Sequence, residues 1–290
     1  MRSRHAALLA LVVSGSLSVV ATAAPKKPAA GGGKAAPACG AKVLPLVVGN
    51  QWTYNLTPAL VAAQPAIAKL APMAPKSIVV DVMAIDLKGA DTVVAIREKL
   101  HFDVTKDEKK PKFIDRELTG TVTCNAKGKF DISPELTWFA GEPGGYQGLA
   151  FDKFDRKKET SLKLTAGAIG EEKWTEEIAA HWTQIPSKDS GATLQSGTLE
   201  LERAFIPQEK ESVTTKMGQY LAEKLALTTT GRITLDKPLS APTAEAGGVS
   251  KPSELPAEWI NTIWLVEGVG VVQTLNQYAH QYTLVDAQLK

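Results

Sequence analysis

The stretch VLPLVVGNQWTYNL, residues 43–56, marks the start of the folded part of this chain. Gly49 and Asn50 are a turn pair, because glycine favours and asparagine tolerates a positive φ. Trp52 and Tyr54 follow at the two-residue spacing that places side chains on one face of a β-strand. No reactive residue accompanies them. The stretch therefore predicts a reversal of the chain that leads into a first strand. This architectural role is favoured over direct contact with a ligand.

The residues before this stretch carry a targeting signal and a spacer. Residues 1–5 are basic, residues 6–24 are uncharged, and Ala21-Thr22-Ala23 supplies the small side chains that signal peptidase requires. We expect a cleaved signal peptide over residues 1–23. A retained anchor is the alternative, although the serines of this segment make a poor membrane span. Residues 24–42 contain Ala, Gly, Pro and Lys without large apolar side chains, which predicts a flexible tether. The protein is thus expected in the bacterial periplasm or outside the cell, with no stable transmembrane span after cleavage.

Residues 43–290 are expected to form one domain, because no linker-like stretch divides them. Of the 33 lysines and arginines, two precede residue 24 and four lie in the tether, so the 31 acidic residues outnumber the basic ones in this domain. Nucleic-acid binding normally requires a concentrated basic face. The charge balance therefore argues against a nucleic-acid partner.

Alternation of apolar and polar residues predicts a mainly β domain: a curved antiparallel sheet or half-barrel meander with short helical turns in its loops. One helical turn is expected from Ser133, which precedes a proline and a glutamate. The apolar residues of 171–182 also fit one stripe of a helix. However, a leucine, an apolar step, a glycine and a Trp-Thr pair follow in the same order just before and within this segment as in the opening stretch, which favours a strand. Three further segments are expected to be irregular. They are an alanine- and proline-rich apolar flap (58–75), a glycine-rich loop (137–150) and a polar loop (239–258). Strands are expected over residues 76–89, 91–107, 113–125, 129–133, 159–165, 171–182, 197–206, 219–235, 262–275 and 280–289.

The two cysteines, Cys39 and Cys124, are expected to form a disulfide, since an exported chain matures in an oxidising compartment. The alternative is a pair of unpaired thiols, with Cys124 buried.

Catalytic patterns are missing from the sequence. The three histidines after the signal segment have no metal-ligand spacing, and we interpret them as surface or interface residues. Gly268 and Gly270 fail as a dinucleotide fingerprint because Gln273 stands where a third glycine is needed and too few residues follow for the helix. Acidic pairs such as Glu176-Glu177 are expected on solvated faces. We therefore predict no catalytic residue, no metal and no cofactor.

The remaining signal is aromatic. Trp52, Tyr54, Trp138, Phe139 and Tyr146 lie in or beside segments expected to pack together, and they are our candidate ligand-binding residues. If the flap and the glycine-rich loop cover one side of the curved sheet, an apolar groove lies between them. The alternative is that these rings only fill the core.

The opening Pro45-Leu-Val-Val-Gly-Asn-Gln-Trp-Thr-Tyr54 resembles that of a group of bacterial secreted proteins and lipoproteins, loosely called TapB-like and mostly of unassigned function. VTTKMGQYLAEKLAL (213–227) and WLVEGVGVVQTL (264–275) resemble two further marks of that group. The chain departs from the group at Lys216-Met217, where a proline-alanine pair is commoner. The resemblance implies a curved antiparallel sheet and brings no catalytic residues.

Two functions follow. The first is a non-catalytic exported cell-envelope protein that binds an apolar or lipid-like small molecule or docks to another envelope protein. The second is a hydrolase whose site is assembled from dispersed carboxylates and a histidine.

Overall fold

The structure, a computed structural model, describes residues 38, 42–59, 73–106, 109–125, 130–136, 149–157, 164–165, 168–169, 173–184, 195–236 and 254–290. Most of these residues belong to antiparallel strands, which confirms the predicted fold class. In this part of the chain, no helix is both long and apolar enough to cross a membrane. The segments 1–23 and 24–37 lie outside the described residues.

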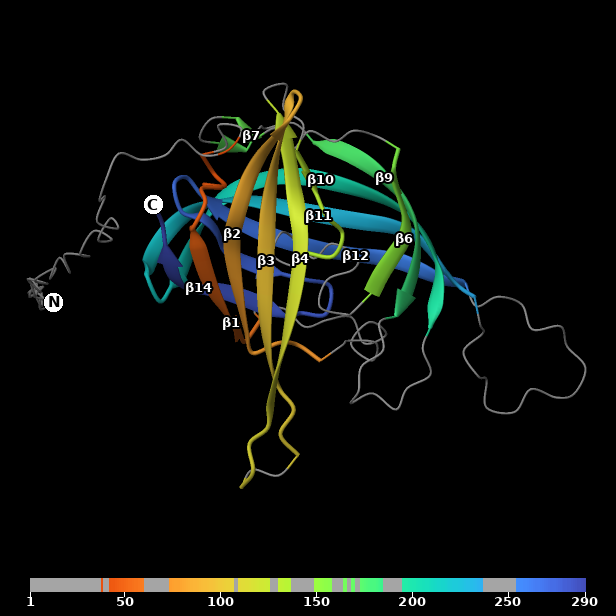
Figure 1. The fold of residues 1–290 in the computed structure, drawn as a ribbon, viewed down its shortest axis with the longest axis horizontal. Helices are drawn as coiled ribbons and strands as arrows, with labels where there is room; N and C mark the ends of the chain where they lie inside the picture. The colour runs from red at the N-terminus through yellow and green to blue at the C-terminus, as the bar shows by residue number, and fades with distance from the viewer. Residues whose placement is uncertain are drawn as a thin grey trace, which may run out of the picture.

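Twelve strands form one open sheet (Figure 1). Two very short strands, β7 (Leu164–Thr165) and β8 (Ala168–Ile169), pair with each other instead. In spatial order the strands of the large sheet are β5 (Phe130–Ile132), β4 (Phe113–Asn125), β3 (Asp91–Asp103), β2 (Ser77–Lys88), β1 (Gln51–Thr57), β14 (Gln281–Gln288), β13 (Gly270–Leu275), β12 (Glu254–Val266), β11 (Gly218–Leu235), β10 (Ser196–Thr215), β9 (Trp174–Gln184) and β6 (Leu149–Arg156).

The sheet consists of two meanders joined in the middle. Strands β1 to β5 run outward to one edge, and strands β14 back to β9 run outward to the other, where β6 is added. The first and last strands are neighbours, with Gln51 opposite Gln288. The opening stretch therefore joins the two ends of the domain.

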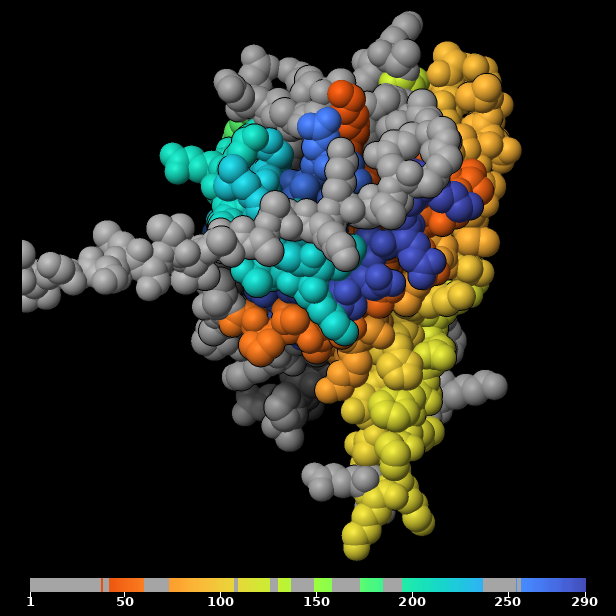
Figure 2. All heavy atoms as spheres, turned by 90° about the vertical axis from the view of Figure 1, so that its left-hand side faces the viewer, coloured from red at the N-terminus to blue at the C-terminus, as the bar shows by residue number. Residues whose placement is uncertain are grey.

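The two halves of the sheet pack face to face. In Figure 1, β2 to β4 cross steeply in front of β10 to β12, and Figure 2 shows the first half as a slab that extends beyond the body at the β3–β4 end. Val80, Ile96 and Val122 of the first half share one apolar core with Leu225 and Ile263 of the second. Each half thus turns an apolar face inward, as the two-residue alternation predicted.

Asn50 anchors the opening stretch. Gly49 has a φ of 84°, and the Asn50 N–H donates to the Val47 carbonyl at 2.9 Å, which confirms the predicted turn. The buried Asn50 side chain donates to the Pro45 carbonyl at 2.6 Å and accepts from the Lys290 N–H at 2.8 Å. One amide therefore ties the start of the domain to its last residue.

Three expectations need correction. The predicted strand 262–275 is two strands, β12 and β13, because a turn at 267–269 separates them and Gly268 and Gly270 take φ values of 73° and 103°. The predicted loop 239–258 ends early, since β12 starts at Glu254. Strand β6 was not predicted, because its charged sequence LAFDKFDR alternates poorly.

Candidate functional site

Of the five predicted ligand-binding residues, the structure describes two, and both are buried. Trp52 and Tyr54 are 0% and 2% exposed. The Trp52 indole N–H donates to the Val269 carbonyl at 2.6 Å, and the Tyr54 hydroxyl donates to the Val271 carbonyl at 2.9 Å. These bonds hold β1 against the β12–β13 turn and give the motif the architectural role expected of it.

The rest of the predicted groove is not described. Trp138, Phe139 and Tyr146, together with flap residues 60–72, lie outside the described residues. Ligand binding at the five aromatic residues therefore stays a prediction.

Cys124 lies on the inner face of β4 and is fully buried. The described residues include no free cysteine. Because its expected partner Cys39 lies outside them, the pairing of the two cysteines stays a prediction.

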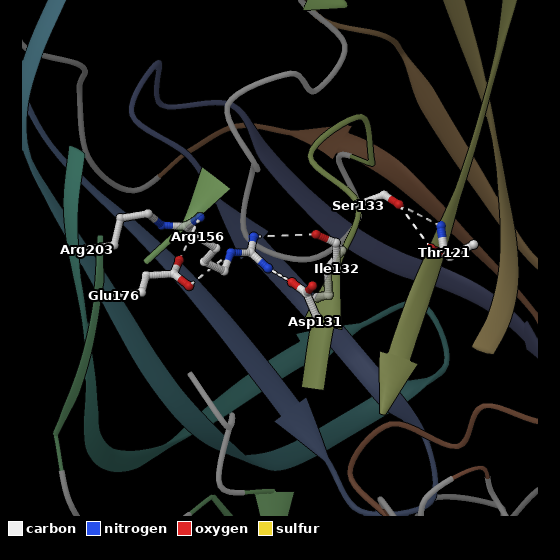
Figure 3. A network of polar contacts seen from close by, with 7 residues as sticks. All are labelled: Thr121, Asp131, Ile132, Ser133, Arg156, Glu176 and Arg203. Carbon is white, nitrogen blue, oxygen red and sulfur yellow. Dashed lines mark hydrogen bonds and ion pairs between the residues drawn. The ribbon is translucent and has the colours of Figure 1, made fainter. Parts of the chain in front are cut away.

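The candidate site is a network of charged side chains where the two edges of the sheet meet (Figure 3). Arg156, the last residue of β6, forms an ion pair with Asp131 of β5 and donates to the Ile132 carbonyl at 3.4 Å. Arg156 Nε lies 3.4 Å from Glu176 Oε2, and Glu176 Oε1 lies 3.2 Å from Arg203 Nη1. We call Asp131, Arg156, Glu176 and Arg203 the seam network.

The seam network runs from the protein surface into the interior. The side chain of Asp131 is 48% exposed and that of Arg156 is 14% exposed, whereas those of Glu176 and Arg203 are 4% and 3% exposed. Burial lowers the pKa of Arg156, with the positive charge of Arg203 acting in the same direction and the carboxylate of Glu176 opposing it. The arginine pKa is ordinarily so high that both guanidinium groups keep their charge. The network therefore keeps full charges inside the sheet, where their removal from water is costly.

Ser133 fixes the β5 side of the seam. The backbone N–H of Thr121 in β4 donates to Ser133 Oγ at 2.8 Å, and the Ser133 N–H donates to the Thr121 carbonyl at 2.9 Å. The Leu136 N–H closes a turn onto the Ser133 carbonyl at 3.2 Å, where the sequence predicted one. Asp131 is thus held at the rim by the strand that precedes it.

The seam network borders a second apolar cluster on the inner face of β6 and β9 to β12. We call it the far cluster. It is separate from the main core and contains two tryptophans and two phenylalanines among its apolar side chains. Its members are Leu149, Phe151, Phe154, Ile178, Ala180, Trp182, Leu199, Leu201, Ile233, Leu235, Ala257 and Trp259.

Strand pairing places the seam network and the far cluster side by side. Arg156 of β6 lies opposite Ile178 of β9. Glu176, the inward-facing residue that precedes Ile178 in β9, lies opposite Arg203 of β10. A bulge in β6 brings Phe151 and Phe154 to the same inner face, and their rings meet edge to face at 5.6 Å. The Arg156 guanidinium lies 5.2 Å from the Phe154 ring centre. The charged and apolar groups therefore form one continuous amphipathic surface.

Sequence reasoning missed the seam network. Glu176 was expected on a solvated face but is buried, because it alternates with Ile178 and Ala180 on the inner face of β9. Arg203 likewise alternates with Leu201 and Phe205 on β10. The signal was a charged residue at an apolar position of a strand. Arg156 and Asp131 carry no such signal.

A second charged cluster lies on the outer face. His181 Nδ1 lies 2.7 Å from Asp152 Oδ1, and its Nε2 lies 3.2 Å from Asp236 Oδ2. Ser196 Oγ donates to the same Asp236 oxygen at 2.5 Å. The hydrogen bond to Asp152, then the one to Asp236, raises the pKa of His181, while its hydrogen bond lowers the pKa of Asp152. We call His181, Asp152 and Asp236 the histidine clamp, since they connect β6, β9 and the end of β11.

The histidine clamp does not resemble a hydrolytic site. Both ring nitrogens contact carboxylates, whereas a general base needs one nitrogen directed at the nucleophile. Ser196 bonds to a carboxylate rather than to the imidazole. Within the described ranges, no group of three or more His, Cys, Asp or Glu side chains is arranged to hold a metal ion. The clamp is best explained as an electrostatic link between strands.

Comparisons with known proteins give distant likenesses only. No protein-family model and no curated protein matches the sequence. A candidate exported protein with a YmcC-like fold from Bacteroides fragilis is 13% identical, with a TM-score of 0.42, and the match covers 84% of this chain and 98% of that one. A candidate lipoprotein from Parabacteroides distasonis is 10% identical, with a TM-score of 0.40 over 86% and 99% of the two chains. The hypothetical lipoprotein YmcC from Escherichia coli is 11% identical, with a TM-score of 0.29 over 69% and 85%. None of these likenesses assigns a function to this chain.

Proposed function

We propose that this chain is an exported, non-catalytic protein of the bacterial envelope that binds an apolar or lipid-like molecule on the inner face of its sheet. The observation that carries the proposal is the far cluster, an aromatic-rich surface inside the sheet that is separate from the main core. Export rests on the basic, apolar and small-residue pattern of residues 1–23. Membership of the TapB-like group stays part of the proposal.

The make-up of the far cluster favours binding over simple packing. Phe151, Phe154 and Trp259 are only partly buried, although each lies on the inner face of the sheet. Small-molecule sites are concave surfaces lined mainly by aromatic and aliphatic groups with a few polar groups at one side. The far cluster supplies the aromatic and aliphatic groups, and the seam network supplies the polar groups at one side. Transfer of each CH₂ group of a ligand to such a surface contributes about 0.8 kcal/mol.

A fluorescent fatty-acid analogue tests the proposal. We expect 11-(dansylamino)undecanoic acid to bind the purified mature protein saturably and to bind the Phe154→Ala variant more weakly. Phe113→Ala is the matched control, because Phe113 is 52% exposed and lies at the start of β4. Circular dichroism establishes that each variant is folded. No binding at tens of micromolar, together with no lipid that co-purifies from the native host, would refute the apolar-ligand function and leave docking to an envelope protein.

The hydrolase alternative is tested separately. His181 is held by two carboxylates, and this geometry does not suit proton transfer to a substrate. A panel of generic ester, glycoside and phosphate substrates separates the two functions. Turnover that His181→Gln abolishes would favour the hydrolase.

A further inference from the structure

We infer that the seam network is a binding site for the anionic head group of a single-chain amphiphile, such as an alkyl carboxylate or alkyl phosphate, whose tail lies along the far cluster. This inference rests on the proposed function and names its ligand class. Arg156 is the group that contacts the head, and Asp131 is the group that the ligand displaces.

The position of Arg156 suits such a head group. Its guanidinium lies between the half-exposed Asp131 and the buried Glu176, so one end of it is close to water and the other is inside the sheet. Guanidinium groups match carboxylate and phosphate oxygens with paired N–H donors. The aliphatic stem of such an arginine packs along apolar surface while its guanidinium keeps its charge, and the Phe154 ring lies 5.2 Å from that guanidinium.

Glu176 and Arg203 hold Arg156 in place. Glu176 contacts both guanidinium groups, and Arg203 is itself 3% exposed beside the Phe205 ring at 5.3 Å. Both are positioning residues, since neither reaches the rim. Their role is to keep Arg156 directed at the seam with its charge intact.

Asp131 acts as an internal substitute for the ligand. It presents a carboxylate to Arg156 from the opposite edge of the sheet, at the position where the carboxylate of a fatty acid would lie. Because its side chain is 48% exposed, water can solvate it once it is released. Because Arg156 is 14% exposed, its charge has to stay paired, so the incoming anion takes the place of Asp131 directly. The formal charge of the seam network is zero before exchange, and the incoming anion takes over the charge balance as Asp131 turns to solvent.

The far cluster determines which anions bind. Phe154 is next to the guanidinium, and Ile178 and Leu201 continue the same inner face away from the rim. A head group without a tail gains nothing from this surface, and a tail without a charge leaves the Asp131 ion pair unbroken. The site therefore requires both parts in one molecule.

The experiment measures displacement of 11-(dansylamino)undecanoic acid by four ligands below their micelle concentrations: laurate, dodecyl phosphate, 1-dodecanol and acetate. We expect laurate and dodecyl phosphate to bind wild type well, dodecanol about tenfold or more weakly, and acetate not at all. Arg156→Ala should weaken laurate binding by about tenfold or more and leave dodecanol unchanged. Asp131→Asn should tighten laurate binding by up to about fivefold, because the competing carboxylate is gone.

Arg232→Ala is the matched control, since Arg232 forms an exposed ion pair with Glu200 on the outer face of the same sheet. Asp131→Asn also keeps the inference testable if Arg156→Ala fails to fold. Equal binding of laurate and dodecanol by wild type, or weaker laurate binding in Asp131→Asn, would overturn the head-group site while the apolar-ligand function stands. Binding of neither compound would overturn the proposed function itself.

Discussion

Replacement of Asn50 by alanine should destabilise the whole domain, although the residue lies in a turn. The side chain is 1% exposed and bonds to two backbone groups that are far apart in the chain, the Pro45 carbonyl and the Lys290 N–H. A buried backbone group left without a partner costs about 1–3 kcal/mol. Alanine removes both bonds, but only the bond to Pro45 is fully buried and Lys290 is exposed to water, so we expect a loss of about 1–3 kcal/mol of unfolding free energy and a fall in Tm on the order of 5 °C.

The assay is urea unfolding followed by far-UV circular dichroism, with Asn55→Ala as the matched control on the exposed face of β1. Asn50→Asp should destabilise at neutral pH at least as much as Asn50→Ala, because a buried carboxylate oxygen would face the Pro45 carbonyl oxygen. An Asn50→Ala loss below about 0.5 kcal/mol, the usual range for surface substitutions, would refute the reasoning. So would a loss equal to that of the control.

Three further predictions concern other parts of the chain. Gly231→Ala should prevent folding or greatly lower the urea midpoint, because its φ is 146° and a Cβ would lie 2.1 Å from a carbonyl of β10; an unchanged midpoint would contradict the strand register. The stability difference between wild type and His181→Gln should be largest between about pH 4 and 6.5, measured as Tm across pH 4–8. The raised pKa of His181 contributes stability below its ordinary value of 6.5, and this stability is lost as pH rises through the folded pKa. The lowered pKa values of Asp152 and Asp236 contribute stability above 3.8, and this stability is lost as pH falls. A stability difference that stays constant with pH would exclude the clamp. Intact mass of exported protein should show an N-terminus at Ala24 and a Cys39–Cys124 bridge, and two thiols that alkylate without reduction would refute the bridge.

The strands were predictable where one face is apolar and the other polar. Residues 91–103 alternate between buried and partly exposed positions, residues 77–88 are rich in β-branched side chains, and Gly89 between them takes a φ of 64°, so both strands and their hairpin follow from local pattern. The split between β12 and β13 was missed because Gly268 and Gly270 fit a bulge as well as a turn. Only the fold decides between them, since Trp52 packs against Gly270 from the other end of the chain, where a Cβ would lie 3.2 Å from its indole nitrogen.

Two of the four residues of the seam network could have been predicted from the sequence, and two could not. A charged residue at an apolar position of a strand, such as Glu176 or Arg203, conflicts with the surrounding pattern, and such conflicts concentrate at functional sites. Both residues could have been singled out from their strands alone. Arg156 and Asp131 lie on the two edge strands, and no local pattern states that these edges meet. That contact depends on how the two halves of the sheet pack, and the same packing places the Arg156 guanidinium beside the Phe154 ring. Local pattern can therefore detect Glu176 and Arg203, whereas Arg156 and Asp131 meet only because the two halves of the sheet pack together.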